Sequence, residues 1–183
     1  MNLKNHRQKQ KNGVTLVELL VVTTIIVIMS AVIYPSYRDI RGQLLLERAA
    51  HKLGQDIRKA GEMAMSAKMY GEAVPNGYGV YLILGTTFYV LYADMPAGSG
   101  NERYDSGEEI PPTPIQMEGG VRISSATPSG MSINFRPPSP TIKIFGNDQA
   151  QPVPEAIISL SLTSNPSKTK SIRINAGGLI DIE

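Results

Sequence analysis

The longest hydrophobic run lies close to the start of the chain. Residues 14–34 are apolar or weakly polar apart from one charged residue, Glu18. A helix of this length is about 30 Å long, which matches the hydrocarbon core of a bilayer. The pattern therefore predicts a transmembrane helix over residues 14–35. Four hydroxyl side chains are expected to bond to the preceding helical turn: Thr15, Thr23, Thr24 and Ser30.

Beyond this run, apolar residues recur at alternating spacings of four and three positions. The repeat predicts an amphipathic helix over residues 36–72, with a kink at Pro35, whose nitrogen has no hydrogen to donate. The Ala-rich far end favours packing on a sheet over a coiled coil, because alanine makes a weak coiled-coil seam. Three glycines mark either bends or close contacts: Gly42, Gly54 and Gly61. The apolar positions are Leu46, Ala50, Leu53, Ile57, Ala60, Ala64 and Ala67.

From residue 75 onward the sequence changes to short stretches with strand character. Residues 78–84 and 87–93 predict a hairpin, and the Pro- and Gly-rich residues 94–114 predict a long exposed loop. One long helix followed by antiparallel strands predicts an α+β fold, with the helix packed on a β-rich domain over residues 75–183. Residues 115–117 are expected to pair with 121–124, and residues 170–175 and 179–182 to form a last hairpin around Ala176-Gly177-Gly178. The other predicted strands are 131–135, 141–145 and 156–163.

Charge is distributed unevenly along the 183 residues, although the net charge is only +2. The segment 1–13 holds four basic residues and no acid, which leaves 14 basic and 16 acidic residues, or −2, for the rest. A positive head before an apolar helix predicts a cytoplasmic N-terminus and an exterior C-terminal domain. A secretory signal peptide is the alternative, but this run is longer than such signals and lacks a clear small-residue cleavage site.

Glu18 is the informative residue of the apolar run. A carboxylate inside a membrane is costly, by roughly 2.5 kcal/mol or more at the centre of a spanning helix. Glu18 lies near the cytoplasmic end, where the cost is smaller and the positive end of the helix dipole favours an acid. A buried carboxylate needs a cationic partner, and the next basic residue after Lys11 is Arg38. A free α-amino group on a neighbouring subunit would meet this need if the chain were cut just before the run.

The segment from Gly13 to Val22, with sequence GVTLVELLVV behind a basic leader, resembles the N-terminus of type IV prepilins and type II secretion pseudopilins. The resemblance implies cleavage by a prepilin peptidase between Gly13 and Val14, removal of the leader 1–13, and N-methylation of Val14. It makes Glu18 the fifth mature residue, which the family uses in subunit assembly, and Pro35 the twenty-second. Val14 departs from the usual Phe. The outer domain resembles that of H-type minor pseudopilins in architecture only.

The resemblance implies a structural subunit of a type II secretion pseudopilus or a type IV pilus, which supports protein secretion and is not an enzyme. The implied partners are a prepilin peptidase, other pilin or pseudopilin subunits, an inner-membrane assembly platform and the lipid bilayer. The implied location is the bacterial inner membrane, as a single-pass protein, and then a periplasmic or surface filament. The missing cysteines favour a pseudopilin or minor pilin over a major pilin, whose C-terminal loop a disulfide often closes.

The residue inventory offers little else for chemistry. The absence of cysteine excludes a disulfide scaffold, a zinc–thiolate site and thiol catalysis, and no nucleotide-binding or hydrolase motif is present. We therefore expect no cofactor and no metal. Asp105, Glu108 and Glu109 are candidates for calcium, but their spacing does not resemble a calcium-binding loop. Nucleic acid is not an expected partner, because the basic residues near the C-terminus are sparse. Two alternatives stay open: a membrane-anchored binding module that does not polymerise, and an anchored hydrolase.

Overall fold

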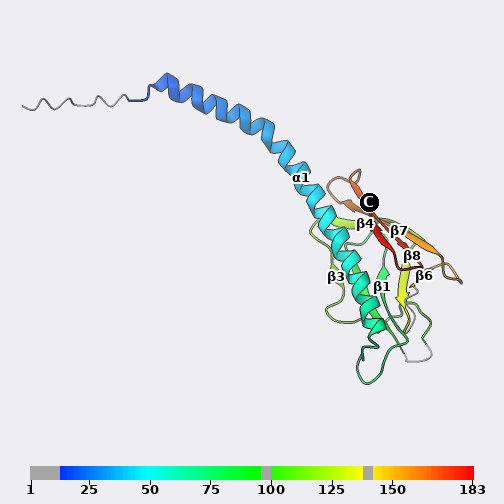
Figure 1. Ribbon diagram of the computed structural model, residues 1–183. Helices are drawn as coiled ribbons and strands as arrows, with labels where there is room; N and C mark the ends of the chain where they lie inside the picture. Colours follow the sequence, from blue (N-terminus) through cyan, green and yellow to red (C-terminus); the bar gives the residue numbers. More distant parts are fainter. Residues whose placement is uncertain (1–12, 96–99, 138–141) are drawn as a thin grey trace, which may run out of the picture. The chain divides into compact units, whose positions relative to one another are not determined.

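The computed structural model describes residues 13–95, 100–137 and 142–183. The chain forms two compact units, Met1–Arg41 and Gly42–Glu183. One helix, α1 (Leu16–Met65), begins in the first unit and ends in the second, and the strands belong to the second unit (Figure 1). Residues 1–12, which make up most of the predicted leader, lie outside the described residues.

The first unit consists of the apolar part of α1. Leu16–Tyr34 is long and apolar enough to cross a membrane, with a mean hydropathy of 2.7, and none of it is buried within the protein. The helix continues through Pro35, so the predicted transmembrane and amphipathic segments form a single helical element. The kink at Pro35 stays a prediction.

The second unit contains two antiparallel sheets. A five-stranded sheet has the order β3-β2-β1-β5-β6, and a four-stranded sheet has the order β4-β7-β8-β9. The strands are β1 (Gly77–Leu82), β2 (Phe88–Asp94), β3 (Ile115–Gln116), β4 (Val121–Thr127), β5 (Met131–Phe135), β6 (Ile142–Gly146), β7 (Glu155–Leu162), β8 (Thr169–Asn175) and β9 (Ile180–Ile182). The α+β fold with a long helix on antiparallel strands is confirmed, but the strands make two sheets.

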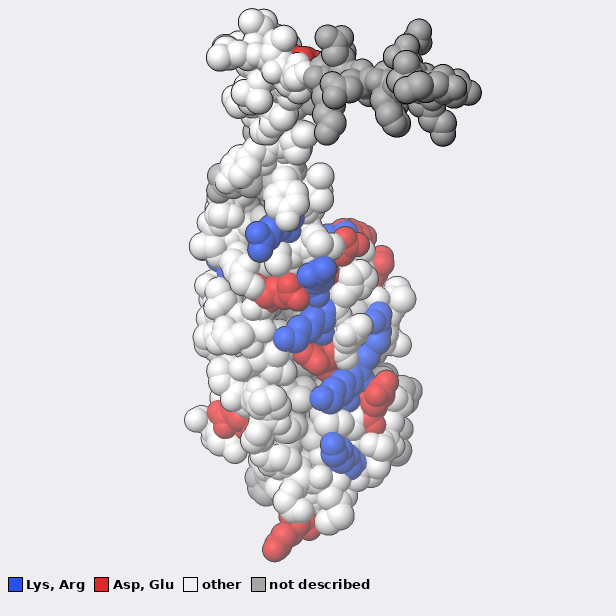
Figure 2. Space-filling view, turned by 90° about the vertical axis from the view of Figure 1, so that its left-hand side faces the viewer, with Lys and Arg blue, Asp and Glu red and all other residues white. Residues whose placement is uncertain are grey.

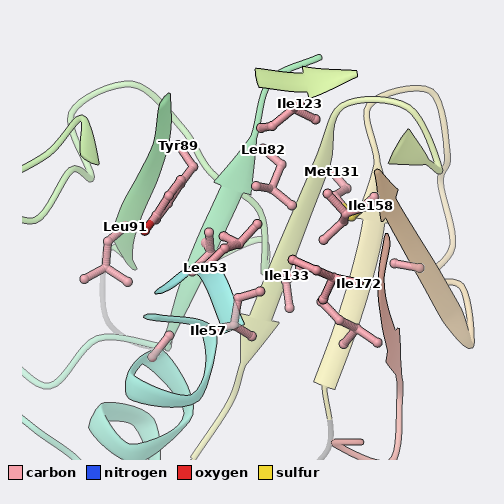
Figure 3. Close-up of a cluster of buried hydrophobic side chains, with 14 of the residues drawn as sticks. Leu53, Ile57, Leu82, Tyr89, Leu91, Ile123, Met131, Ile133, Ile158 and Ile172 are labelled. Carbon is pink, nitrogen blue, oxygen red and sulfur yellow. The ribbon is translucent and has the colours of Figure 1, made fainter. Parts of the chain in front are cut away.

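The core lies between the second half of α1 and the inner faces of both sheets. The predicted apolar stripe is confirmed from Leu46 to Ala64, since its members are at most 3% exposed. Leu53 and Ile57 of α1 point toward side chains from both sheets, including Ile133 of β5 and Ile172 of β8 (Figure 3). Their burial in one cluster favours the folded domain by about 25 cal/mol per Å² of apolar surface removed from water.

Two of the three helix glycines are close-contact points. A Cβ on Gly61 would lie 3.1 Å from the ring of Phe135 in β5, and a Cβ on Gly42 would lie 2.7 Å from Leu162 Cδ1 in β7. Such distances are shorter than ordinary carbon contacts, so the missing side chains let α1 approach both sheets closely. The sequence left close contact and bending open, and the structure favours close contact at these positions.

The end of α1 differs from the predicted boundary. The helix stops at Met65 rather than near residue 72, and Ala67 is exposed instead of buried. Ala67 has a φ of 45°, Lys68 N donates to Met63 O at 3.1 Å, and Ala67 N donates to Ala64 O at 3.0 Å. These two bonds form a Schellman motif, which usually has glycine at the left-handed position. The prediction was wrong because an alanine gave no stop signal.

The predicted strands form, but not all of them pair with the strands that the sequence suggested. The hairpin of β1 and β2 is confirmed, and so is the final hairpin of β8 and β9. Residues 115–117 and 121–124 do form strands, but β3 pairs with β2 and β4 pairs with β7, in different sheets. The loop 94–114 is less exposed than predicted, since Glu108 is only 5% exposed and Glu109 bridges to Tyr92.

Candidate functional site

The first described residues approach the helix as exposed, non-helical chain. Gly13, Val14 and Thr15 precede the first helical residue, Leu16, and Val14 is 71% exposed. A Cβ placed on Gly13 would meet no atom within 4 Å. The Gly13–Val14 peptide bond is therefore exposed to solvent, as a bond that a peptidase cleaves has to be.

The start of α1 is capped by the residues that the motif supplies. Thr15 Oγ1 accepts a hydrogen bond from Glu18 N at 3.2 Å, and Leu19 N donates to Thr15 O at 3.1 Å. Thr15 is thus the N-cap and Glu18 the third helical residue, which is the spacing of a capping box. The expectation that Thr15 bonds back to a preceding turn was wrong, because Gly13 and Val14, the described residues before it, are not helical. The Thr-x-x-Glu pattern was the sequence signal for this cap.

Glu18 is the one acidic or basic side chain among the described residues from 13 to 34. It is exposed in the chain and lies in the first turn of α1. Hydroxyl groups later in this segment bond to the backbone of their own helix: Thr24 Oγ1 donates to Leu20 O at 2.8 Å, and Ser30 Oγ donates to Ile26 O at 2.7 Å. The predicted back-bonds are confirmed there and at Thr23. Glu18 alone thus presents a charge for an external partner.

The comparisons with known proteins bear on this segment. Residues 8–34 match the family model described as the prokaryotic N-terminal methylation motif. The match covers 27 of the 183 residues and supports the resemblance of this segment to the N-termini of type IV prepilins and pseudopilins. The motif implies processing by a prepilin peptidase and assembly with other pilin subunits, and it fits a single-pass anchor in the inner membrane. No curated protein and no solved structure matches the chain significantly.

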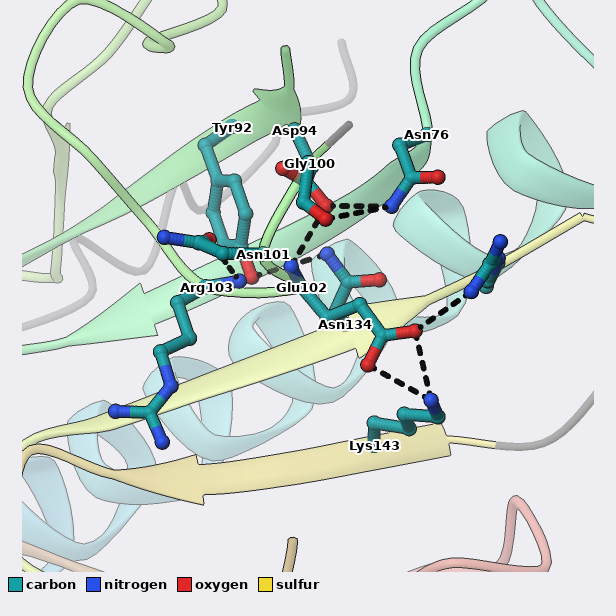
Figure 4. A network of polar contacts seen from close by, with 10 residues as sticks. Asn76, Tyr92, Asp94, Gly100, Asn101, Glu102, Arg103, Asn134 and Lys143 are labelled. Carbon is teal, nitrogen blue, oxygen red and sulfur yellow. Dashed lines mark hydrogen bonds and ion pairs between the residues drawn. The ribbon is translucent and has the colours of Figure 1, made fainter. Parts of the chain in front are cut away.

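A second group of polar residues lies on the outer face of the five-stranded sheet (Figure 4). Asp94, at the end of β2, is fully buried, and its Oδ2 accepts hydrogen bonds from Asn76 Nδ2 at 3.0 Å and Glu102 N at 2.9 Å. Burial raises the pKa of the Asp94 carboxyl above its usual range. Burial likewise raises the pKa of Glu108. Its two oxygens accept from Met95 N at 2.7 Å and Asp105 N at 2.8 Å.

The same loop is tied to the sheet by charge and by stacked rings. The Glu102 carboxylate, whose side chain is only 12% exposed, lies 2.7 Å from Lys143 Nζ of β6 and 3.2 Å from Arg136 Nη1. Tyr104 stacks on Tyr81 of β1, with ring centroids 4.7 Å apart. These contacts occupy the polar groups of the loop and fix it against the sheet. The network therefore stabilises the fold.

The calcium candidates do not assemble a metal site in the structure. All three bond to protein groups: Glu108 accepts from backbone amides, Glu109 accepts from the Tyr104 hydroxyl, and Asp105 accepts from the Asn101 side-chain amide. Among the described residues, no three His, Cys, Asp or Glu side chains lie together so as to hold a metal ion. The N-terminal segment is therefore the best candidate for the functional site.

Proposed function

We propose that this protein is a filament subunit of the pilin kind, made as a prepilin and assembled through its apolar N-terminal helix into a type II secretion pseudopilus or a type IV pilus. The observation that carries the proposal is Glu18, the lone charge in the unburied apolar segment Leu16–Tyr34 of α1. It lies four residues after Val14, within the residues 8–34 that match the methylation motif. The missing cysteines support a pseudopilin or minor pilin, and the role we propose is support of protein secretion.

The charge on Glu18 would make subunits assemble in one defined register. A lone carboxylate and a lone ammonium each lose hydration on entering a low-dielectric environment, and their mutual attraction offsets that loss only when they meet. The α-ammonium of Val14 on a neighbouring subunit is the partner that cleavage supplies. Pairing Glu18 with it favours one axial register between two helical segments that otherwise present only uncharged side chains.

Cleavage at Gly13 therefore permits assembly as well as removing the leader. Before cleavage, the Val14 nitrogen is an uncharged amide and cannot form the ion pair. After cleavage, it is an ammonium, and a single N-methyl group leaves that positive charge in place. We infer that the leader stays in the cytoplasm, that Gly42–Glu183 lies outside, and that an inner-membrane platform supplies the force for assembly.

The proposal is tested by separating charge from helix capping at Glu18. The variant Glu18→Gln keeps the capping-box pattern, which accepts Glu or Gln, but removes the charge. We expect Glu18→Gln and Glu18→Ala to be processed and inserted normally, and to enter sheared filaments at least tenfold less than the unmodified chain. Thr24→Val is the matched control, since it removes a polar group from the same helix without changing charge, and we expect it to assemble normally.

Two results would contradict the proposal. Equal incorporation of Glu18→Gln and the unmodified chain would remove the ion-pair argument. A chain recovered from membranes at full length, and absent from filaments, would instead indicate the anchored binding module. The N-terminus of the filament-borne protein is read by mass spectrometry, which also shows whether Val14 is methylated.

A further inference from the structure

The folded domain has two chemically different surfaces on either side of α1. At 100° per residue, Lys52 and Lys59 project to one side of the buried stripe, while Gly54 and Arg58 project to the other. The contacts agree with this geometry: Lys52 Nζ donates to Gln116 O at 3.3 Å, beside β3, and Arg58 Nη2 donates to a β9 carbonyl at 3.4 Å. One side of α1 thus borders the five-stranded sheet's edge, and the other borders β9.

The first surface is a groove of about 500 Å³ between α1 and the proline-rich segment before β3. Its apolar lining includes Met63, Leu91 and Ile115. Three exposed lysines also line it: Lys52, Lys59 and Lys68. We call this surface the lysine groove. Figure 2 shows Lys and Arg side chains gathered on one face of the domain, with single acidic residues between them.

The lysine groove has a positive charge available for a partner. Asp56 is its one acidic lining residue, so its net charge is 3 − 1 = +2. The Asp56 carboxylate already accepts a hydrogen bond from the Tyr89 hydroxyl. Among the described residues, none forms a hydrogen bond or ion pair with the ammonium of Lys59 or Lys68. An apolar floor under unpaired lysines fits a partner with an apolar side chain beside carboxylates.

The second surface lies at the β8–β9 turn and carries that combination. Leu179 is 63% exposed, and Asp181 and Glu183 are exposed beside it. The turn is fixed by two bonds, from Asn175 N to Leu179 O at 3.1 Å and from Leu179 N to Asn175 Oδ1 at 2.9 Å. We call residues 179–183 the acidic edge. Because its backbone is already ordered, docking it costs little conformational entropy.

The charge of the acidic edge is opposite to that of the lysine groove. Arg173 of β8 lies opposite Asp181 in the ladder and pairs with Glu155 at 3.2 Å. The exposed charges at β9 and beside it are therefore three acids, Glu155, Asp181 and Glu183, against two bases, Arg58 and Arg173, which leaves one net negative charge. Matching potentials of this kind favour one partner and one orientation.

We propose that the acidic edge of one subunit docks into the lysine groove of a second copy of this chain, with Leu179 against the apolar floor and Asp181 and Glu183 beside Lys59 and Lys68. The inference rests on the proposed function. A contact between two different surfaces on opposite sides of one element is heterologous, and repeating such a contact without closure makes a helical filament. The outer domains then add a second, charge-dependent contact to that of the membrane helices.

The chain contains no cysteine, so a cysteine pair tests the contact directly. We expect the double variant Lys59→Cys with Asp181→Cys to form a ladder of disulfide-linked multimers in filaments under mild oxidation. Each single-cysteine variant should form no ladder. The matched control pairs Lys59→Cys with Asp148→Cys, which places the second thiol on an exposed turn after β6 and should also give no ladder.

A charge exchange tests the same contact without cross-linking. We expect Lys59→Glu and Asp181→Lys each to lower filament incorporation about tenfold, and the two together to restore it to within about twofold. Both side chains are exposed, and equal unfolding midpoints of the variants exclude a folding defect. Filaments that assemble without the cysteine ladder, or a double exchange that restores nothing, would overturn the docking and leave the proposed function intact. Failure of the unmodified chain to form filaments would overturn the proposed function itself.

Discussion

At the scale of single residues, Ala67 occupies a backbone conformation that suits glycine. Its φ of 45° lies in the left-handed region, where a Cβ costs roughly 1–2 kcal/mol. We expect Ala67→Gly to stabilise the domain by about 1 kcal/mol, because the Schellman bonds remain and the strain is relieved. Urea unfolding of the full chain in detergent, followed by tyrosine fluorescence, measures this change.

Ala64→Gly is the matched control, three residues earlier in the same helix. Ala64 is buried within the last turn, so glycine there should destabilise by about 1 kcal/mol. Equal effects of the two substitutions would show that the conformation at Ala67 carries no strain.

Glu18 combines two roles that operate in different states of the chain. In the structure its backbone amide is held by the Thr15 hydroxyl, which fixes where α1 begins. In the proposed filament its carboxylate meets the ammonium of Val14 on another subunit. Both roles depend on the same short spacing, so the residues that mark the cleavage site also determine how far the charge lies from the new N-terminus.

At the scale of elements, the sequence was most informative where periodicity is strong. The stripe from Leu46 to Ala64 predicted the buried face of α1, and alternation predicted strands such as β7, whose inward residues Ala156, Ile158 and Leu160 are all fully buried. Periodicity is a local property, so it predicts which face is buried. It does not predict which strand lies beside which. The sequence therefore did not indicate that β3 and β4, which are neighbours along the chain, belong to different sheets.

The contacts of the polar loop could not be predicted from local sequence for the same reason. Asp94 bonds to Glu102 N and to Asn76, while Glu108 bonds back to Met95 N. A run rich in Pro and Gly indicates a loop, but the burial of its acids depends on how the loop folds back over the sheet. The N-terminal site was easier to predict, because its function depends on a contiguous motif.

The buried acids of this loop predict a pH dependence of stability. Because burial raises the pKa of the Asp94 carboxyl above its usual range, the folded state keeps the proton to higher pH than the unfolded state does. The stability that this proton contributes is present at low pH and is lost as pH rises through the raised pKa. We expect the unmodified chain to lose stability relative to Asp94→Asn as pH rises from 4 to 8. Unfolding midpoints of both proteins, measured at each pH, test this expectation.

The variant Glu108→Gln should show the same direction, because burial also raises the pKa of Glu108. Asn and Gln resemble the protonated acids in size and carry no charge at any of these pH values. A difference between the unmodified chain and Asp94→Asn that stays constant with pH would mean that ionisation of Asp94 is not opposed by the fold.

At the scale of the whole molecule, the two units contribute different kinds of contact to the proposed filament. The segment Leu16–Tyr34 of the first unit supplies an apolar helix with a single charge, Glu18. Its contact favours one register but does little to distinguish one partner from another. The unit Gly42–Glu183 supplies the lysine groove and the acidic edge, whose opposite charges distinguish one surface from another. Salt should therefore weaken the second contact more than the first, because exposed charges are screened and buried ones much less.

Blocking cleavage tests whether the freed amine is needed for assembly. Gly13 is exposed, and a side chain there would meet no atom within 4 Å, so Gly13→Leu should leave folding and membrane insertion unchanged while hindering the peptidase. We expect this variant to remain at full length and to enter filaments at least tenfold less than the unmodified chain, because Val14 keeps an uncharged amide opposite Glu18. Immunoblots of membrane and sheared filament fractions measure both quantities. Full-length chain in filaments at normal levels would show that assembly does not depend on the ion pair that cleavage makes available.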